Sequence, residues 1–252
     1  MGGAVEGPQQ LRAAVRERVE RGVDVIKVMG SGGVNTPGTD VARCQFTLDE
    51  LRLVVDAAHA AGLPVTVHAH ALAAVEQALD AGADGIEHCT CLTADGVRIT
   101  DALLERLARQ GTTVCPTLGK TAQAVPPPQV QTVMDRFGLS MEERQRAAAR
   151  MHRAGVRLVS GADSGINAGK PHGIVPAAVA GLAAGGVPAD AALATAMSLA
   201  ADACGIADRK GRLRRGLDAD LLVVRGDPLT DMTALADPLA VLVSGAWAHG
   251  PG

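Results

Sequence analysis

The chain has 252 residues, of which 47% are hydrophobic, so it is long enough to bury a substantial core in one or two domains. Its net charge of -3, without basic runs, argues against nucleic acid or a membrane surface as a partner, since both need concentrated positive charge. No apolar stretch approaches the roughly 20 residues of a membrane span, and residues 1–10 lack a secretory signal pattern, so we expect a soluble, cytoplasmic protein.

Helices and strands are predicted to alternate along most of the chain. Apolar residues at helical spacing predict a helix over 8–21, which Gly22 ends before a strand at 23–29. Gly30-Ser-Gly-Gly33 follows, and we interpret it as a flexible loop. Thr47-Leu-Asp-Glu50 has the pattern of a capping box and predicts the start of the next helix. The alternation then continues with a strand at 64–69, a helix at 71–80, a strand at 84–88, a helix at 100–110, a strand at 112–117, helices within 129–154 and a strand at 156–160.

Strands that alternate with helices of 10 to 15 residues predict a parallel sheet with right-handed crossovers. All five strands should then end on the same side of that sheet. After two further helices, short strands separated by turns are predicted within 211–224 and 239–243, with Gly-Asp-Pro at 226–228 as a turn. The sequence therefore predicts an α/β domain over 1–205 and a small β element over 206–252.

Four residues of types that bind metals or carry chemistry lie near the ends of predicted strands, and they are Lys27, His68, His88 and Asp163. A parallel α/β barrel brings side chains from the C-terminal ends of its strands to one mouth, so residues distant in sequence can surround one ion. A lysine within an apolar strand is also unusual, because an unpaired buried ammonium is costly to desolvate. The pattern favours a metal centre at the barrel mouth.

Each of these residues also has a structural interpretation. Lys27 is alternatively a buried amine paired with a neighbouring acid, and Asp163 is alternatively the cap of a tight turn. Arg43 is a candidate for binding a substrate carboxylate through a bidentate pair. His172 is either a residue that contacts substrate or a surface-loop residue.

The histidines of the Val-His-Ala-His segment are expected to share one side of their strand. His68 and His70 are two residues apart, so the period of a strand points both rings to the same side. We expect His68 to bind metal and His70 to face substrate or to be a hydrogen-bonded core residue. By the same alternation, Glu87 is expected on the face opposite to His88.

The cysteines are predicted to be reduced thiols. There are five, an odd and scattered set that does not suggest a disulfide framework. Cys89 and Cys91 follow closely after His88, but small buried side chains are the commoner state of such residues. We assign them no role in metal binding.

Five motifs and the tail resemble the amidohydrolase superfamily, especially its imidazolonepropionase-like and Xaa-Pro dipeptidase-like branch. Together they cover almost the whole chain. The motifs are Ile-Lys-Val-Met-Gly-Ser-Gly-Gly33, Val-His-Ala-His-Ala71, Gly-Ile-Glu-His-Cys89, Cys-Pro-Thr-Leu118 and Ser-Gly-Ala-Asp-Ser164, and the tail segment Gly216–Leu229 is similar to part of the family's small β-sandwich.

The resemblance implies a fold and a metal site. Lys27 would end barrel strand four and bridge two divalent ions as an N-carboxylated lysine, a carbamate formed from CO2. His68 and His88 would end strands five and six and bind the second ion, while Asp163 would end strand eight, bind the first ion and act as general base. Neutral imidazoles and carboxylates suit one or two Zn²⁺ ions.

The chain departs from the family pattern in one respect. Members begin their barrel with a His-x-His pair on strand one, and no histidine precedes Lys27 here. We therefore expect a partial (β/α)8 barrel of the TIM type, strands four to eight, with half of the sandwich at its C-terminal end. In an alternative assignment His68 and His70 are themselves the strand-one pair, and the bridging lysine should lie well downstream. Lys120 and Lys170 lie there in loop-like segments, however, and His88 follows too soon for another strand-six ligand.

The sequence leaves three functional hypotheses open. The first is a metal-dependent hydrolase of amide or other C–N bonds that acts on a small peptide-like, N-acyl amino acid or cyclic amide substrate. The second is a lyase or aldolase in which Lys27 forms a Schiff base. The third is a non-catalytic remnant, or a subunit completed by another chain, and we expect a homo-oligomer.

Overall fold

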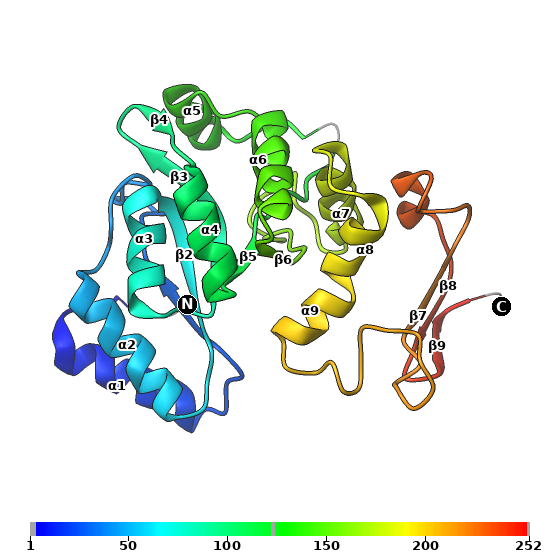
Figure 1. Ribbon diagram of the computed structural model, residues 1–252, viewed down its shortest axis with the longest axis horizontal. Coiled ribbons are helices and arrows are strands. Elements are labelled where there is room, and N and C mark those ends of the chain that lie inside the picture. Colours follow the sequence, from blue (N-terminus) through cyan, green and yellow to red (C-terminus); the bar gives the residue numbers. More distant parts are fainter. Residues whose placement is uncertain (1–3, 122–123, 251–252) are drawn as a thin grey trace. The chain divides into compact units, whose positions relative to one another are not determined.

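The structure is a computed structural model that describes residues 4–121 and 124–250 (Figure 1). The chain forms two compact units. The first contains the segments up to Cys115, 128–139 and 154–156, and the second contains 116–127, 140–153 and the segment from Arg157 onward.

The first unit is built on a parallel sheet. Its strands are β1 (Ile26–Met29), β2 (Val65–Ala71), β3 (Gly85–Thr93), β4 (Gly96–Val97) and β5 (Thr113–Cys115). Strands β1, β2, β3 and β5 are neighbours in that order and run parallel, whereas β4 pairs antiparallel with the end of β3. The parallel order confirms the predicted α/β class. The hairpin of β3 and β4 has no counterpart in the sequence-based prediction.

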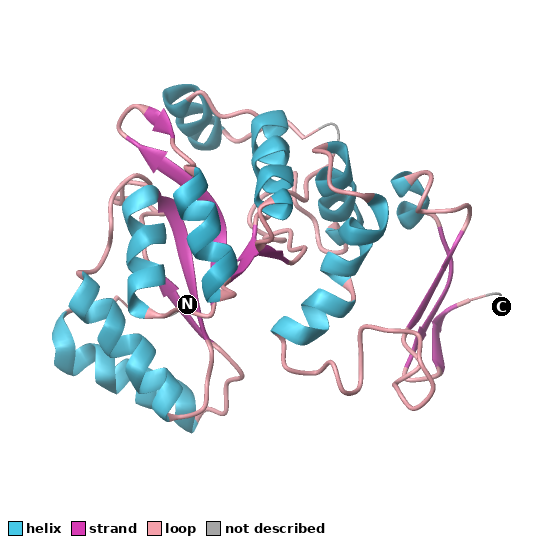
Figure 2. Cartoon of the chain, in the orientation of Figure 1, coloured by secondary structure: helices cyan, strands magenta, loops and turns pink. Residues whose placement is uncertain are grey.

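Helices pack on one face of this sheet. The helices of the unit are α1 (Gly7–Glu20), α2 (Leu48–Ala60), α3 (Leu72–Ala81), α4 (Asp101–Gln110) and α5 (Pro128–Phe137). Of these, α2 and α3 contact the strands of the sheet. Figure 2 shows α3 lying along β2 and β3. The β2 side chains on this face, those of Val65, Val67 and Ala69, are completely buried. The alternate residues of β2, Thr66 and His68, therefore face the other side, where the chemistry-bearing side chains lie.

Several helix boundaries follow directly from the sequence. The capping box is present, because the Glu50 amide donates to Thr47 Oγ1 (3.3 Å) and the Thr47 amide donates to Glu50 Oε2 (2.9 Å). Hydrogen bonds from the backbone and hydroxyl of Thr47 lower the pKa of Glu50. Helices α3 and α4 end at Gly82 and Gly111, whose φ angles of 79° and 68° lie in the left-handed region that glycine adopts readily. These predicted helix ends are confirmed.

The glycine-rich segment Gly30–Gly33 is buried and tightly packed. A Cβ on Gly32 would lie 2.3 Å from the backbone oxygen of Asp40, and one on Gly30 would lie 2.5 Å from Val67 Cγ1. The interpretation of this segment as a flexible loop is therefore wrong. Its glycines allow two backbone segments to approach closely beside the end of β1.

The second unit combines helices with a separate antiparallel sheet. Its elements are α6 (Met141–Arg153), β6 (Arg157–Leu158), α7 (Val175–Ala184), α8 (Ala189–Ala196), α9 (Ser198–Ala203), β7 (Leu221–Val224), η1 (Met232–Ala236), β8 (Pro238–Val243) and β9 (Ala246–His249). Strands β7, β8 and β9 form the sheet in that order. The predicted turn at 226–228 is present, because Asp227 Oδ1 accepts a hydrogen bond from the Leu229 amide (2.9 Å). Strand β9 lies beyond the last strand that the sequence predicts, at 239–243.

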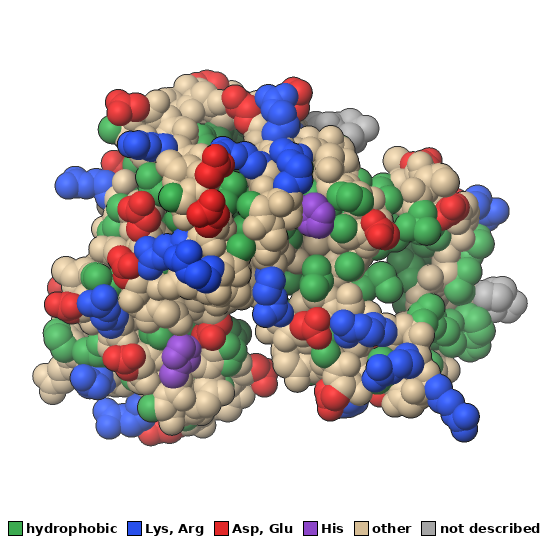
Figure 3. Space-filling model, viewed as in Figure 1, with side chains coloured by type: hydrophobic (Ala, Val, Ile, Leu, Met, Phe, Trp, Pro, Cys, Tyr) green, Lys and Arg blue, Asp and Glu red, His purple; other side chains and the backbone are tan. Residues whose placement is uncertain are grey.

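Within residues 4–121 and 124–250, none of the helices is long and apolar enough to cross a membrane. On the face drawn in Figure 3, positive and negative side chains are interspersed. All five cysteines belong to the described part of the chain and are free thiols, as predicted.

Candidate metal centre

Three histidines of the first unit gather at the end of its sheet. His68 and His70 come from β2, and His88 comes from β3. The ring centroids are 4.8 Å apart for His68 and His70, 4.5 Å for His68 and His88, and 4.3 Å for His70 and His88. One ring nitrogen from each lies within 4.8 Å of the other two. This spacing allows all three imidazoles to bind one ion after small rotations of their rings.

The backbone of β3 turns His88 toward the other two rings. In the strand register His88 pairs with Ala69, a completely buried residue on the helix-covered face. His88 instead has φ of 69°, in the left-handed region that non-glycine residues rarely adopt, and its ring stacks on His70. Glu87 occupies the same face as the histidines, because its Oε1 accepts from Thr66 Oγ1 (3.0 Å). The expectation that Glu87 and His88 lie on opposite faces is therefore wrong.

Such a backbone conformation costs of order 1–3 kcal/mol and persists only where surrounding contacts enforce it. Cys89 and Cys91 also have positive φ angles, 49° and 58°, so the unusual conformation continues beyond His88. Both cysteines are buried, as predicted. A hydrogen bond with the Cys91 thiol and burial raise the pKa of Cys89 well above its usual value. Cys89 therefore stays a neutral thiol.

Hydrogen bonds hold two of the rings in place. His68 Nε2 lies 3.2 Å from the carbonyl oxygen of Gly32, which can only accept, so this nitrogen is an N–H donor and in the neutral ring Nδ1 carries the lone pair. His70 Nδ1 lies 2.9 Å from Thr90 Oγ1. The His70 amide also donates to Ser31 Oγ (2.9 Å), and Ser31 is completely buried.

This donor set fits a divalent transition metal. Neutral imidazole is a favoured ligand of Zn²⁺ and related ions, and histidine ligands in proteins usually form a hydrogen bond through the second ring nitrogen. His68 and His70 both have such bonds, and His68 is only 7% exposed. Ser31, Gly32 and Thr90 are supporting residues that sequence reasoning missed. The glycine-rich segment after β1 was the available signal for two of them.

Lys27 lies on the histidine face of the sheet but is exposed. In the register it pairs with Thr66, and the next pair on that face joins Met29 to His68. Because the Lys27 side chain reaches solvent, the argument that a buried ammonium must be compensated does not apply to it. Its candidacy as a ligand rests on its position near His68.

The other predicted site residues are divided between the units. Arg43 is exposed in the first unit, and its carbonyl accepts from the Gly32 amide (3.2 Å), so its backbone adjoins the segment that contacts His68. Asp163 and His172 belong to the second unit. Asp163 is exposed with φ of 54°, and His172 packs close enough to Gly165 that a Cβ there would lie 3.2 Å from its Nε2.

Lysine 170 supports the loop that carries Asp163. Its Nζ donates to the carbonyl of Ala162 (2.8 Å), the residue before Asp163, and to the carbonyl of Thr117 (3.2 Å). Both partners of Lys170 lie in the second unit, and these bonds fix the backbone next to the Asp163 carboxylate.

Comparison with known proteins agrees with this fold. The amidohydrolase family model matches residues 2–248, so the chain belongs to the amidohydrolase family. Ochratoxinase of Aspergillus niger is 27% identical over 98% of this chain and 51% of its own length. An uncharacterized protein of Mycobacterium bovis is 30% identical over 96% of this chain and 62% of its own length.

Solved structures show the same relationship. A crystal structure described as a Xaa-Pro dipeptidase with bound methionine in the active site has a TM-score of 0.84 and 28% sequence identity. The match covers 98% of this chain and 60% of that one. The chain thus spans about half to two thirds of the length of these relatives, and the predicted family resemblance is confirmed.

Proposed function

We propose that this protein is a metal-dependent hydrolase of amide or other C–N bonds in a small peptide-like, N-acyl amino acid or cyclic amide substrate. The observation that carries the proposal is the group formed by His68, His70 and His88. Membership in the amidohydrolase family supports the reaction class, and a relative named as a dipeptidase supports a small peptide-like substrate. We further propose that the strands from β1 to β6, apart from β4, correspond to strands four to eight of a (β/α)8 barrel.

The three imidazoles would hold a divalent ion, with Zn²⁺ as the best match to their chemistry. When bound, such an ion lowers the pKa of water toward 7 and polarises a carbonyl group. The carbonyl of Gly32 and the hydroxyl of Thr90 hydrogen-bond the rings of His68 and His70 and so would orient them toward the ion.

Asp163 is the proposed general base. Its carboxylate accepts a proton from the attacking water and later delivers it to the leaving nitrogen. The support for this role is its residue type and its place after β6 in the family's order of motifs. Arg43 and His172 are proposed substrate contacts, with Arg43 pairing with a substrate carboxylate.

Lys27 is a proposed ligand in its carbamate form. Its amine would form an N–C bond to CO2 and release a proton, which converts a cation into an oxygen ligand. Solvent exposure leaves Nζ accessible for that reaction, and the register places Lys27 on the face of the sheet that carries His68.

Metal analysis of three variants tests the proposal. The wild-type chain is expected to retain Zn²⁺ after dialysis, and His88→Ala is expected to lose it. His59→Ala is the matched control, because His59 lies on α2 and bonds Asp84 (2.8 Å) outside the group. Asp163→Asn should keep the ion held by the three histidines and lose hydrolysis of N-acyl amino acids. A wild-type chain that takes up no divalent ion, or a His88→Ala variant that binds it unchanged, would refute the proposal.

A further inference from the structure

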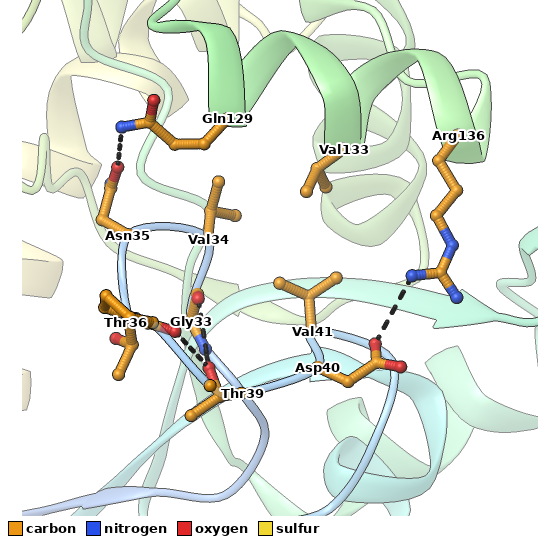
Figure 4. Close-up of a pocket in the computed structure, with 12 residues that line it drawn as sticks. Gly33, Val34, Asn35, Thr36, Thr39, Asp40, Val41, Gln129, Val133 and Arg136 are labelled. Carbon is orange, nitrogen blue, oxygen red and sulfur yellow. Dashed lines mark hydrogen bonds and ion pairs between the residues drawn. The ribbon is translucent and has the colours of Figure 1, made fainter.

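A pocket lies in the first unit between helix α5 and the loop that follows β1 (Figure 4). Its volume is about 600 Å³, within the range of roughly 300–1,000 Å³ typical of sites for small molecules. The loop contributes residues 33–41, and α5 contributes Gln129, Val133 and Arg136. None of the predicted site residues lines it.

Three valines form an apolar part of the pocket lining. Figure 4 shows Val133 projecting from α5 toward the loop, with Val34 and Val41 on the opposite side. Val41 is buried in a core cluster with Leu92 and Phe137, and both Val34 and Val133 pack against that cluster. The apolar surface of the pocket is therefore continuous with the core of the unit, and this packing limits collapse of the pocket.

The polar groups at the rim are already paired with each other. Gln129 Nε2 donates to Asn35 Oδ1 (3.1 Å), and Arg136 forms an ion pair with Asp40 (3.7 Å). The two charges cancel, so the rim offers no net attraction to an anion or a cation. A charged group that entered the valine-lined interior would lose hydration without gaining a counter-charge there. These features favour an uncharged apolar group.

One peptide group connects the pocket to the histidine group. The carbonyl of the Gly32–Gly33 peptide contacts His68 Nε2 (3.2 Å), and its N–H donates to Thr39 Oγ1 (3.2 Å) on the pocket wall. A Cβ on Gly33 would lie 2.8 Å from Thr36 Oγ1, so the wall is closely packed at this point. A group bound in the pocket therefore lies against the same backbone that orients His68.

We propose that this pocket binds an uncharged aliphatic or aromatic group of the substrate, either a side chain or an acyl group, and so sets specificity. That the bound group belongs to a substrate rests on the proposed hydrolase function. Binding in the pocket itself requires no metal. The substrate is then expected to carry an apolar group next to the Gly32–Gly33 peptide.

Binding of N-acetyl-L-phenylalaninamide, followed by NMR titration of the full chain, tests the inference. Val133→Phe should fill the pocket and weaken binding at least tenfold, and Val34→Phe should do the same from the opposite wall. Val130→Phe is the matched control, since Val130 lies three residues earlier on α5 and does not line the pocket. The unfolding midpoint of each variant shows whether it remains folded.

The expected result is binding that Val133→Phe or Val34→Phe weakens and Val130→Phe does not, with N-acetyl-L-aspartic acid amide binding at least tenfold more weakly. Equal affinity for the aspartyl probe, unchanged affinity in both pocket variants, or no binding of the phenylalanyl probe would overturn the inference. Uptake of Zn²⁺ by the wild type separates the two proposals. If the phenylalanyl probe behaves as expected but the wild type takes up no Zn²⁺, the pocket stands and the hydrolase proposal fails; the reverse pattern rejects the pocket alone.

Discussion

Replacement of Thr90 by valine removes one hydroxyl from the support of the histidine group while preserving the shape of the side chain. Thr90 Oγ1 lies 2.9 Å from His70 Nδ1, while the His70 backbone amide donates separately to Ser31 Oγ. Thr90 is only 8% exposed, so little water is available to replace the lost partner. The Thr90→Val variant should therefore bind Zn²⁺ more weakly without unfolding.

The expected size of the effect follows from the contacts of His70. Loss of a hydrogen-bonded partner behind a ligand histidine typically weakens metal binding about 10- to 100-fold. The His70 ring also stacks on His88 at 4.3 Å, and that contact keeps part of its orientation after the substitution. We therefore expect the lower end, about tenfold, which corresponds to about 1.4 kcal/mol of binding free energy.

Competition with a chromogenic chelator at neutral pH measures this change. Thr112→Val is the matched control, because Thr112 is another buried threonine of the first unit, 4% exposed, and lies outside the histidine group. The control should bind Zn²⁺ as the wild type does. If Thr90→Val binds within twofold of the wild type while His88→Ala loses the metal, the reasoning about support of His70 is refuted.

Two further substitutions test packing and charge. Gly32→Ala places a Cβ 2.3 Å from the Asp40 backbone oxygen and should cost about 1–3 kcal/mol in urea denaturation; an unchanged midpoint would contradict the close packing. Lys210 hydrogen-bonds the carboxylates of Asp218 and Asp220 and lowers the pKa of both. The stability that these pairs contribute is therefore present above the ordinary pKa of an aspartate and is lost as the pH falls through the lowered values. Lys210→Met should raise both pKa values in an NMR titration, and unshifted titrations would exclude the ion pairs.

The sequence by itself determined the order of the elements and the class of the fold. Apolar runs rich in valine and isoleucine alternate with amphipathic segments, and local signals such as the Thr47 capping box and Gly82 mark helix ends. These signals act within a few residues, so they can be read without the rest of the chain. The period of a strand likewise placed His68 and His70 on one side of β2.

The composition of the histidine group depended on the tertiary structure. His88 joins the group because its φ is positive, and the regular alternation of β3 gives no sign of that conformation. Ser31, in the segment after β1, and Thr90, on β3, reach His70 across separations of 39 and 20 residues. The pocket likewise forms only where the loop after β1 meets α5. Such contacts depend on how distant segments pack, and no local pattern of residues encodes them.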